Sequence, residues 1–313
     1  MDLKRWWVYQ RERFPLFANG LLVVAFSFSA VSFSILLRNH LDLSEKIELP
    51  GAAVLSVAFF TSLIFFLLLR IADEFKDFEE DSKYRAYRPV PRGLVSLKEL
   101  GWVGVFIILI QLALALWLDT LLIIPLLITW LYLALMTKEF FVADWLKQSP
   151  ITYMWSHMLI MPLIDFYATA ADWISAGLTS PPHGLFWFLI VSFFNGIVIE
   201  VGRKIRAPED EEEGVETYTI IWGRKRAIAV WLAAMIVTAI SASAAALLID
   251  FFNYIIVLLA ILIVIAVFLA IRFLQEPNSK RAGWIEKMSG IWTLLMYLNL
   301  GVVPLGLIYF NLI

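Results

Sequence analysis

Long apolar runs alternate with short polar connectors along almost the whole chain. Crossing a hydrocarbon core of about 30 Å takes roughly 20 residues of helix. Runs of about that length fall at nine places: residues 15–37, 51–72, 100–118, 120–136, 150–170, 184–202, 227–249, 252–271 and 290–310. These runs are apolar all round, without the two-residue alternation of a membrane-spanning strand. The pattern predicts an all-α membrane protein with nine transmembrane helices in a single domain, residues 1–313.

The distribution of basic residues between the two sides of the membrane agrees with nine spans. Loops on the cytoplasmic side of a membrane carry an excess of Lys and Arg. With the N-terminus inside, all of the 25 basic residues except Arg38 and Lys46 fall on the inner side. Residues 1–14, which hold Trp6 and Trp7 among basic side chains, predict an interfacial helix. We therefore expect an integral protein of the inner (cytoplasmic) membrane, with its N-terminus toward the cytoplasm.

Composition excludes several classes of protein. Hydrophobic residues make up 61% of the chain, whereas a soluble domain has roughly 45–50%. The cysteine count is zero, which excludes a disulfide-stapled fold. The formal net charge of −2 gives no basic excess with which to bind nucleic acid, so we expect no nucleic-acid partner.

Polar residues concentrate in residues 73–96, directly after the second predicted span. Asp73, Asp77 and Asp81 are four residues apart, so a helix places them on one face. Neighbouring carboxylates repel each other, and Mg²⁺ takes such hard oxygen ligands together with substrate phosphates. The alternative interpretation is a solvated loop that only sets topology. The basic residues that follow are candidate phosphate donors: Lys83, Arg85, Arg88 and Arg92.

A second polar cluster occupies residues 195–223, at the end of the sixth predicted span. Glu200 lies where an ionisable side chain is costly and indicates a functional site. Arg203 and Lys204 follow at i+3 and i+4, so a structural ion pair is the alternative. The helix is expected to break at Pro208. Because the two clusters are four helices apart, they indicate a weak internal repeat with two polar sites facing each other.

These residues resemble the UbiA superfamily of intramembrane prenyltransferases. Residues 73–81 and 88–93 keep the spacing of the family's first motif, Asn-Asp-x-x-Asp-x-x-x-Asp followed by Arg-Pro-x-x-x-Gly, with Asp73 in place of the Asn and Glu74 in place of the first Asp. The nine-span layout agrees as well. The second motif is degenerate, since Lys204 stands where an acid is expected. Its matching positions are Glu200, Arg203, Lys204, Asp210, Gly214, Thr217 and Gly223.

The resemblance implies a helical bundle around a central cavity and a Mg²⁺-dependent enzyme with its active site toward the cytoplasm. The enzyme would ionise an isoprenyl diphosphate and transfer the prenyl group to an aromatic or lipid acceptor, with membrane lipid as its surroundings. The implied metal ligands are Asp73, Glu74, Asp77, Asp81, Glu200 and Asp210. Catalytic roles are implied for Asp73, Asp77, Asp81, Glu200 and Lys204. The implied diphosphate contacts are Lys83, Arg88, Arg92, Arg203, Lys138 and Asn19.

Two other functions compete with this prediction. A UbiA-type terpene synthase would ionise the same donor and let the cation cyclise without an acceptor. A transporter or a lipid-binding scaffold would explain the spans but not the carboxylate series. His157 and Asp165, both in the fifth predicted span, receive no assigned role: His157 is either a base or a helix–helix contact, and Asp165 either lines the pocket floor or lies near the outer surface.

Overall fold

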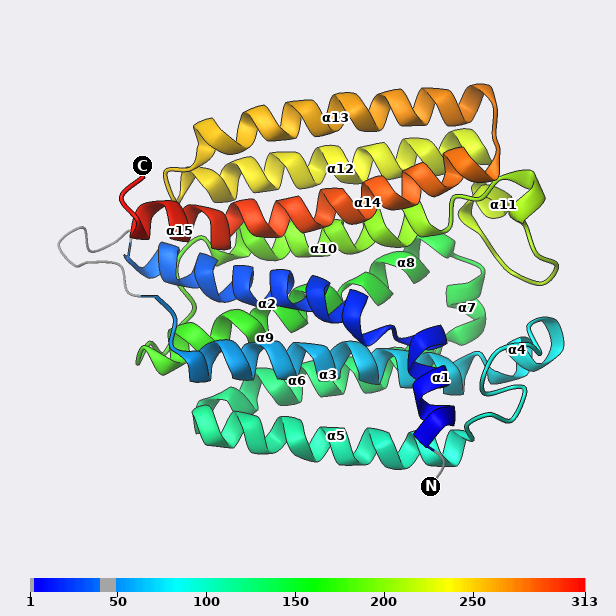
Figure 1. Cartoon of the computed structure of the whole chain (residues 1–313), viewed down its shortest axis with the longest axis horizontal. Helices are drawn as coiled ribbons and strands as arrows, with labels where there is room; N and C mark the ends of the chain where they lie inside the picture. Colours follow the sequence, from blue (N-terminus) through cyan, green and yellow to red (C-terminus); the bar gives the residue numbers. More distant parts are fainter. Residues whose placement is uncertain (1–2, 40–48, 313) are drawn as a thin grey trace.

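A computed structural model describes residues 3–39 and 49–312, so Lys46 lies outside the described part. In these two ranges every regular element is a helix and no strand occurs. The long helices run side by side, and short helices and loops gather at the two ends of the bundle (Figure 1). This architecture confirms the predicted all-α fold.

The N-terminal half contains α1 (Leu3–Arg13), α2 (Leu16–Asn39), α3 (Ala52–Lys76), α4 (Phe78–Tyr84), α5 (Leu97–Leu118), η1 (Thr120–Leu122), α6 (Ile123–Thr137), η2 (Glu139–Phe141) and α7 (Ala143–Lys147). The C-terminal half contains α8 (Pro150–Met158), α9 (Ile160–Ser175), α10 (Leu185–Arg203), η3 (Pro208–Asp210), α11 (Tyr218–Trp222), α12 (Arg224–Leu247), α13 (Phe252–Gln275), α14 (Ser279–Leu300) and α15 (Val302–Tyr309).

Eight helical segments of the described residues are long and apolar enough to cross a membrane, and they coincide with eight of the predicted spans. The remaining predicted span, residues 150–170, corresponds to α8 and α9, two shorter helices that meet at Leu159. Pro162 explains this junction, because it has no amide hydrogen for the carbonyl of Met158 and its ring crowds that carbonyl. The count of nine spans and the orientation of the N-terminus stay predictions.

The last span starts and ends differently from its prediction. Helix α14 begins at Ser279 rather than near residue 290, because the Asn278 side chain caps it by accepting a hydrogen bond from the amide of Arg281. The helix stops at Gly301, where α15 takes over. A Cβ atom on Gly301 would lie 2.3 Å from the backbone oxygen of Ser29 in α2. Only glycine therefore permits this close approach of α2 to the junction.

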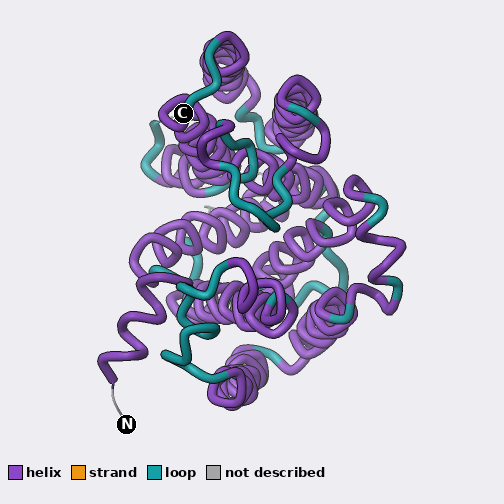
Figure 2. The backbone as a smooth tube through the Cα atoms, turned by 90° about the vertical axis from the view of Figure 1, so that its right-hand side faces the viewer, coloured by secondary structure: helices purple, strands orange, loops and turns teal. Residues whose placement is uncertain are grey.

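A single large hydrophobic core joins α2, α3, α9, α10, α12 and α14. Helix α10 packs against α8, α9, α12 and α14, so the second polar motif lies at the end of a central helix. Figure 2 looks onto the end of the bundle where this motif and the first motif emerge. Buried, tightly packed helices thus position both motifs.

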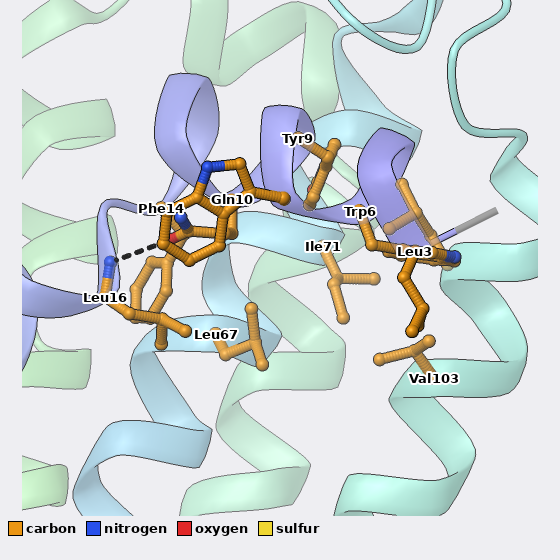
Figure 3. Close-up of a pocket in the computed structure, with 11 residues that line it drawn as sticks. Leu3, Trp6, Tyr9, Gln10, Phe14, Leu16, Leu67, Ile71 and Val103 are labelled. Carbon is orange, nitrogen blue, oxygen red and sulfur yellow. Dashed lines mark hydrogen bonds between the residues drawn. The ribbon is translucent and has the colours of Figure 1, made fainter.

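Helix α1 crosses α3 and α5 rather than running alongside them (Figure 1). Its Tyr9 is buried in a second, smaller apolar cluster with Ile71 of α3 and Leu100 of α5. A surface cavity of about 340 Å³ opens beneath α1, lined almost entirely by apolar side chains (Figure 3). A second cavity, of about 240 Å³, lies among α2, α3 and α15. Neither of these two cavities is lined by an acidic residue of the motifs.

Candidate active site

Both polar motifs lie at the same end of the molecule. The C-terminal ends of α3 and α10 point to this end, where α4, α7 and α11 also gather (Figure 1). Helical hydrogen bonds continue across the α3–α4 junction, since the amide of Asp77 donates to Asp73 and the amide of Asp81 donates to Asp77. The three carboxylates therefore keep the helical spacing that the sequence predicts.

Asp73 and Asp77 are the two acids of the first motif with the fewest close partners. The Asp73 side chain is 46% exposed, and of the described residues only Arg70 lies within ion-pair distance of it, at 3.4 Å. Asp77 forms no side-chain hydrogen bond or ion pair with any described residue. Partial burial raises the pKa of the Asp77 carboxyl, and repulsion from Asp81 adds to this against the lowering effect of Lys76. Both carboxylates would gain from a bound cation.

Glu74 and Asp81 are instead buried in ion pairs. Glu74 accepts a hydrogen bond from Arg13 of α1, and its side chain is 1% exposed. Asp81 pairs with Arg85 at 2.9 Å and with Arg88 at 2.6 Å. These pairs connect the first motif to α1 and to the loop after α4.

The other predicted diphosphate contacts in the first half lie apart from these two carboxylates. Arg92 donates to Glu12 of α1 at 2.9 Å, and Lys83 lies over the ring of its neighbour Tyr84. Lys138 is exposed at the end of α6, and Asn19 is half-buried in the first turn of α2. In the described ranges none of the four side chains forms a hydrogen bond or ion pair with Asp73 or Asp77.

The second motif ends α10 with three charged residues. Glu200 accepts a hydrogen bond from Arg203 at 2.6 Å and pairs with the Nζ atom of Lys204 at 2.8 Å. Helix α10 stops at Arg203, one turn before the predicted break, and the chain is extended at Ala207 as the residue before a proline requires. The group as a whole carries one net positive charge, which suits an anionic ligand.

The acidic run after Pro208 holds the following loop in place. The hydroxyl of Ser279, at the start of α14, donates to Asp210 at 2.8 Å and also contacts Glu209. Glu211 accepts hydrogen bonds from the hydroxyls of Thr217 and Thr219. In this structure Asp210, a predicted metal ligand, therefore contacts the start of α14.

The two motifs face each other across the end of the bundle. Asp73 and Arg203 are close enough to interact electrostatically. Tyr153 of α8 lies near both motifs, since its hydroxyl contacts Lys76 and the charges of Asp73 and Glu200 both act on it. The arrangement sets two carboxylates opposite a cluster with net positive charge.

Sequence reasoning missed several polar groups that belong to this end. Lys76 contacts the hydroxyl of Tyr153 and lies 3.6 Å from Glu139. Lys204 lies over the ring of Tyr218, 5.5 Å from its centroid. Burial, with the charge of Glu200 nearby, raises the pKa of Tyr218, so its hydroxyl stays protonated. The sequence does hold one sign of the role of Lys76, because this residue lies between Asp73 and Asp77 along the chain.

His157 lies beside this group. Its ring stacks on Tyr153 with centroids 4.0 Å apart, and its Nδ1 atom is 2.8 Å from the Tyr153 carbonyl. The Nε2 atom of His157 is buried and has no hydrogen-bond partner among the described residues. This histidine therefore supports the position of Tyr153 and leaves one nitrogen unpaired.

The loops of the two motifs also touch. Gly214 has a positive φ of 74°, and a Cβ atom there would lie 2.6 Å from the ring of Tyr84. Tyr87 donates to Glu212 across the same contact at 3.3 Å. The loop after α10 thus closes against the segment that follows the first motif.

The donor set fits Mg²⁺ bound together with a diphosphate. The described residues contain no group of three or more acidic, His or Cys side chains arranged around one metal position. Mg²⁺ usually takes one or two carboxylates and completes its shell with waters and phosphate oxygens. Asp73 and Asp77 meet that requirement, whereas Glu200 is already paired with two cations.

Comparison with solved structures finds the same fold. A structure described as digeranylgeranylglyceryl phosphate synthase is 18% identical, with 92% of this chain and 99% of that chain covered and a TM-score of 0.59. A UbiA homologue from Aeropyrum pernix K1 is 14% identical over 90% and 95% of the two chains, with a TM-score of 0.63. A UbiA homologue from Archaeoglobus fulgidus, bound to DMAPP and Mg²⁺, is 12% identical over 92% and 98%, with a TM-score of 0.55.

Comparison with curated protein sequences finds no match. A sequence model of the UbiA prenyltransferase family, however, matches residues 48–291, which is well over half of the chain and includes both polar motifs. Together with the all-helical fold and the apolar spans, this match identifies an integral membrane protein. The chain belongs to the UbiA prenyltransferase family.

Proposed function

We propose that this protein is a Mg²⁺-dependent intramembrane prenyltransferase that ionises an isoprenyl diphosphate and passes the prenyl group to an aromatic or lipid acceptor. The observation that carries the proposal is the pair Asp73 and Asp77 opposite Arg203 and Lys204 at one end of the bundle. The family supplies the reaction class, and the related structure bound to DMAPP and Mg²⁺ supports the type of donor.

In the proposed reaction the bond between C1 of the donor and the diphosphate oxygen breaks, and the electron pair leaves with the diphosphate. Mg²⁺ held by Asp73 and Asp77 would neutralise charge on the leaving group. Lys204 and Arg203 would bind the remaining diphosphate oxygens from the opposite side. The allylic cation then bonds to a nucleophilic atom of the acceptor, which loses a proton. Of the sequence-derived candidates, we retain Asp81, Arg88 and Arg92 as residues that position this loop.

The test is pyrophosphate release by the purified protein with C5 to C20 diphosphates, with and without a phenolic acceptor. Asp73→Asn and Asp77→Asn should each lower turnover about 100-fold or more, because each removes a ligand of the catalytic cation. Glu79→Gln, an exposed acid on α4, is the matched control and should leave turnover unchanged. EDTA should stop the reaction and added Mg²⁺ should restore it. Near-normal turnover of both aspartate variants would refute the metal assignment.

A terpene synthase is the second candidate function, and the aromatic rings buried inside the bundle support it. Phe26, Phe188 and Tyr297 lie inside the bundle, and ring faces stabilise a nearby cation. Such an enzyme would need the same two aspartates but no acceptor. Prenyl products that appear only with an acceptor support the transferase, whereas cyclic products formed without one support the synthase.

A further inference from the structure

Four aromatic rings connect the two motif-bearing helices inside the bundle. Phe66 of α3 contacts Phe26 of α2, with ring centroids 5.4 Å apart. Phe26 contacts Tyr297 of α14 at 5.1 Å, and Tyr297 contacts Phe188 of α10 at 5.9 Å. We call Phe66, Phe26, Tyr297 and Phe188 the aromatic row. Because Phe26, Tyr297 and Phe188 are at most 4% exposed, the bundle is tightly packed at this level.

Hydrogen bonds fix the ring of Tyr297 in this position. Its hydroxyl donates to Asp165 of α9 at 2.8 Å and lies 3.2 Å from the hydroxyl of Ser192 in α10. Asp165 is fully buried, and its other oxygen has no partner among the described residues. If Tyr297 swung aside, Asp165 would lose this hydrogen bond in an apolar interior, which is unfavourable. The aromatic row therefore resists opening.

The row lies a short distance beneath the candidate diphosphate site. Phe66 precedes Asp73 by two helical turns on α3, which corresponds to about 10 Å at the helical rise of 1.5 Å per residue. Ser192, level with the Tyr297 hydroxyl, precedes Glu200 on α10 by about 12 Å on the same basis. The aromatic row thus lies about two helical turns below the candidate diphosphate site on both motif helices.

We propose that the aromatic row is the floor of the donor site and restricts the enzyme to C5 and C10 diphosphates. Each five-carbon unit adds four bonds of about 1.5 Å to the main line of an isoprenyl chain. Because the extended chain zigzags, these four bonds lengthen it by roughly 5 Å. Two units span the separation of about 10–12 Å between the diphosphate site and the aromatic row, and a third would meet Phe26 and Tyr297. This inference rests on the proposed function, because it takes the diphosphate to bind between Asp73 and Lys204.

The experiment compares kcat/KM for pyrophosphate release from C5, C10, C15 and C20 diphosphates. The wild type should prefer C10 over C15 and C20 by at least about tenfold, the loss expected when one apolar group no longer fits. Phe26→Ala and Tyr297→Leu should raise the relative rate with C15 by at least about tenfold. Tyr297→Phe keeps the ring and should keep the C10 limit. Phe106→Ala, an exposed ring on α5, is the matched control and should change nothing.

Thermal unfolding checks that each variant is folded, and Phe26→Leu replaces Phe26→Ala if the latter is not. The proposal would be overturned if the wild type used C20 as well as C10. It would also be overturned if the folded Phe26→Ala (or Phe26→Leu) and Tyr297→Leu variants kept the chain-length preference of the wild type. If no donor releases pyrophosphate, the proposed function fails instead. In that case the affinities of the unreactive C10 and C20 thiolodiphosphates test the floor alone, and equal affinities refute it.

Discussion

Glu200 shows how one largely buried acid fixes two neighbouring cations. Its side chain is 14% exposed and holds Arg203 and Lys204 by ion pairs at the end of α10. Without it, two cations would repel each other in a partly buried position. With it, the group has one net positive charge and two donors in fixed places. A site with one metal ion needs such cations to balance a diphosphate.

Lys204→Ala should therefore weaken binding of a diphosphate by about tenfold to a hundredfold, because it removes a charge-assisted hydrogen bond worth about 1.5–3 kcal/mol. Lys204→Asp should place an acid at this position and make turnover depend on a second, weaker Mg²⁺ binding event. Titration of turnover with donor and with Mg²⁺ measures both effects. Lys225→Ala, an exposed lysine at the start of α12, is the control. Identical curves for all four proteins would mean that Lys204 does not contact the diphosphate.

Gly214 controls the contact between the two motif loops. Gly214→Ala should lower turnover several-fold, because a Cβ atom 2.6 Å from the Tyr84 ring forces the loops apart. Gly177→Ala is the matched control, since Gly177 lies outside both motifs and has a similar positive φ of 83°, but a Cβ atom there would meet no other atom within 4 Å. The difference in turnover between the two variants separates the loop contact from the strain of an alanine at positive φ, which both variants share. Equal losses would show that the contact is unimportant.

At the scale of elements, α1 is held to the first motif by charge. Arg13 pairs with Glu74 of α3, Glu12 with Arg92 of the loop after α4, and Arg5 with Glu99 of α5. The Arg13–Glu74 pair is the most buried, with side chains 10% and 1% exposed. Because Glu74 is adjacent to Asp73, α1 contacts the end of α3 next to the proposed metal ligands.

Arg13→Gln should destabilise the protein by about 3–5 kcal/mol, because it leaves the Glu74 carboxylate buried without its cation. The double variant Arg13→Gln, Glu74→Gln should recover most of that loss. Unfolding in mixed micelles gives both values, and turnover of each variant shows whether the first motif is disturbed. Arg11→Gln removes an exposed charge from the same helix and serves as the control. If Arg13→Gln unfolds like Arg11→Gln, the pair does not hold α1 in place.

On the scale of the whole molecule, the bundle has two chemically different ends. The motifs, α1 and the loops with most of the basic residues lie at one end, and the C-terminus lies at the other (Figure 1). At this second end Arg38 of α2 is neutralised by Asp172 of α9 through two hydrogen bonds of 3.1 and 3.2 Å. The positive-inside tendency predicts that the motif end faces the cytoplasm.

The absence of cysteine makes this orientation directly measurable. In intact cells a membrane-impermeant maleimide should label Ser180→Cys, in the loop between α9 and α10, but not Glu79→Cys at the motif end. Both positions are exposed in the structure, so both should react once the membrane is permeabilised. The reverse labelling pattern would contradict the predicted orientation.

The amino-acid sequence by itself determined the elements and the spacing of the motifs. An apolar helix satisfies its own backbone hydrogen bonds, so its place along the chain depends on local composition alone. For the same reason the four-residue spacing of Asp73, Asp77 and Asp81 was readable, and α3 and α4 keep it. The ends of the helices were predicted less accurately than their positions. Asn278 caps the start of α14 and Pro162 separates α8 from α9, and the hydropathy of the chain shows neither effect.

Only the tertiary structure decided which side chains meet. Glu74 and Arg13 are 61 residues apart, and Asp165 and Tyr297 are 132 apart. Neither pairing follows from local spacing, because each depends on which faces of separate helices pack together. The same packing leaves Asp73 and Asp77 available while Glu74 and Asp81 are buried in ion pairs. Contacts between distant segments arise from the burial of complementary surfaces, and these exist only in the folded bundle.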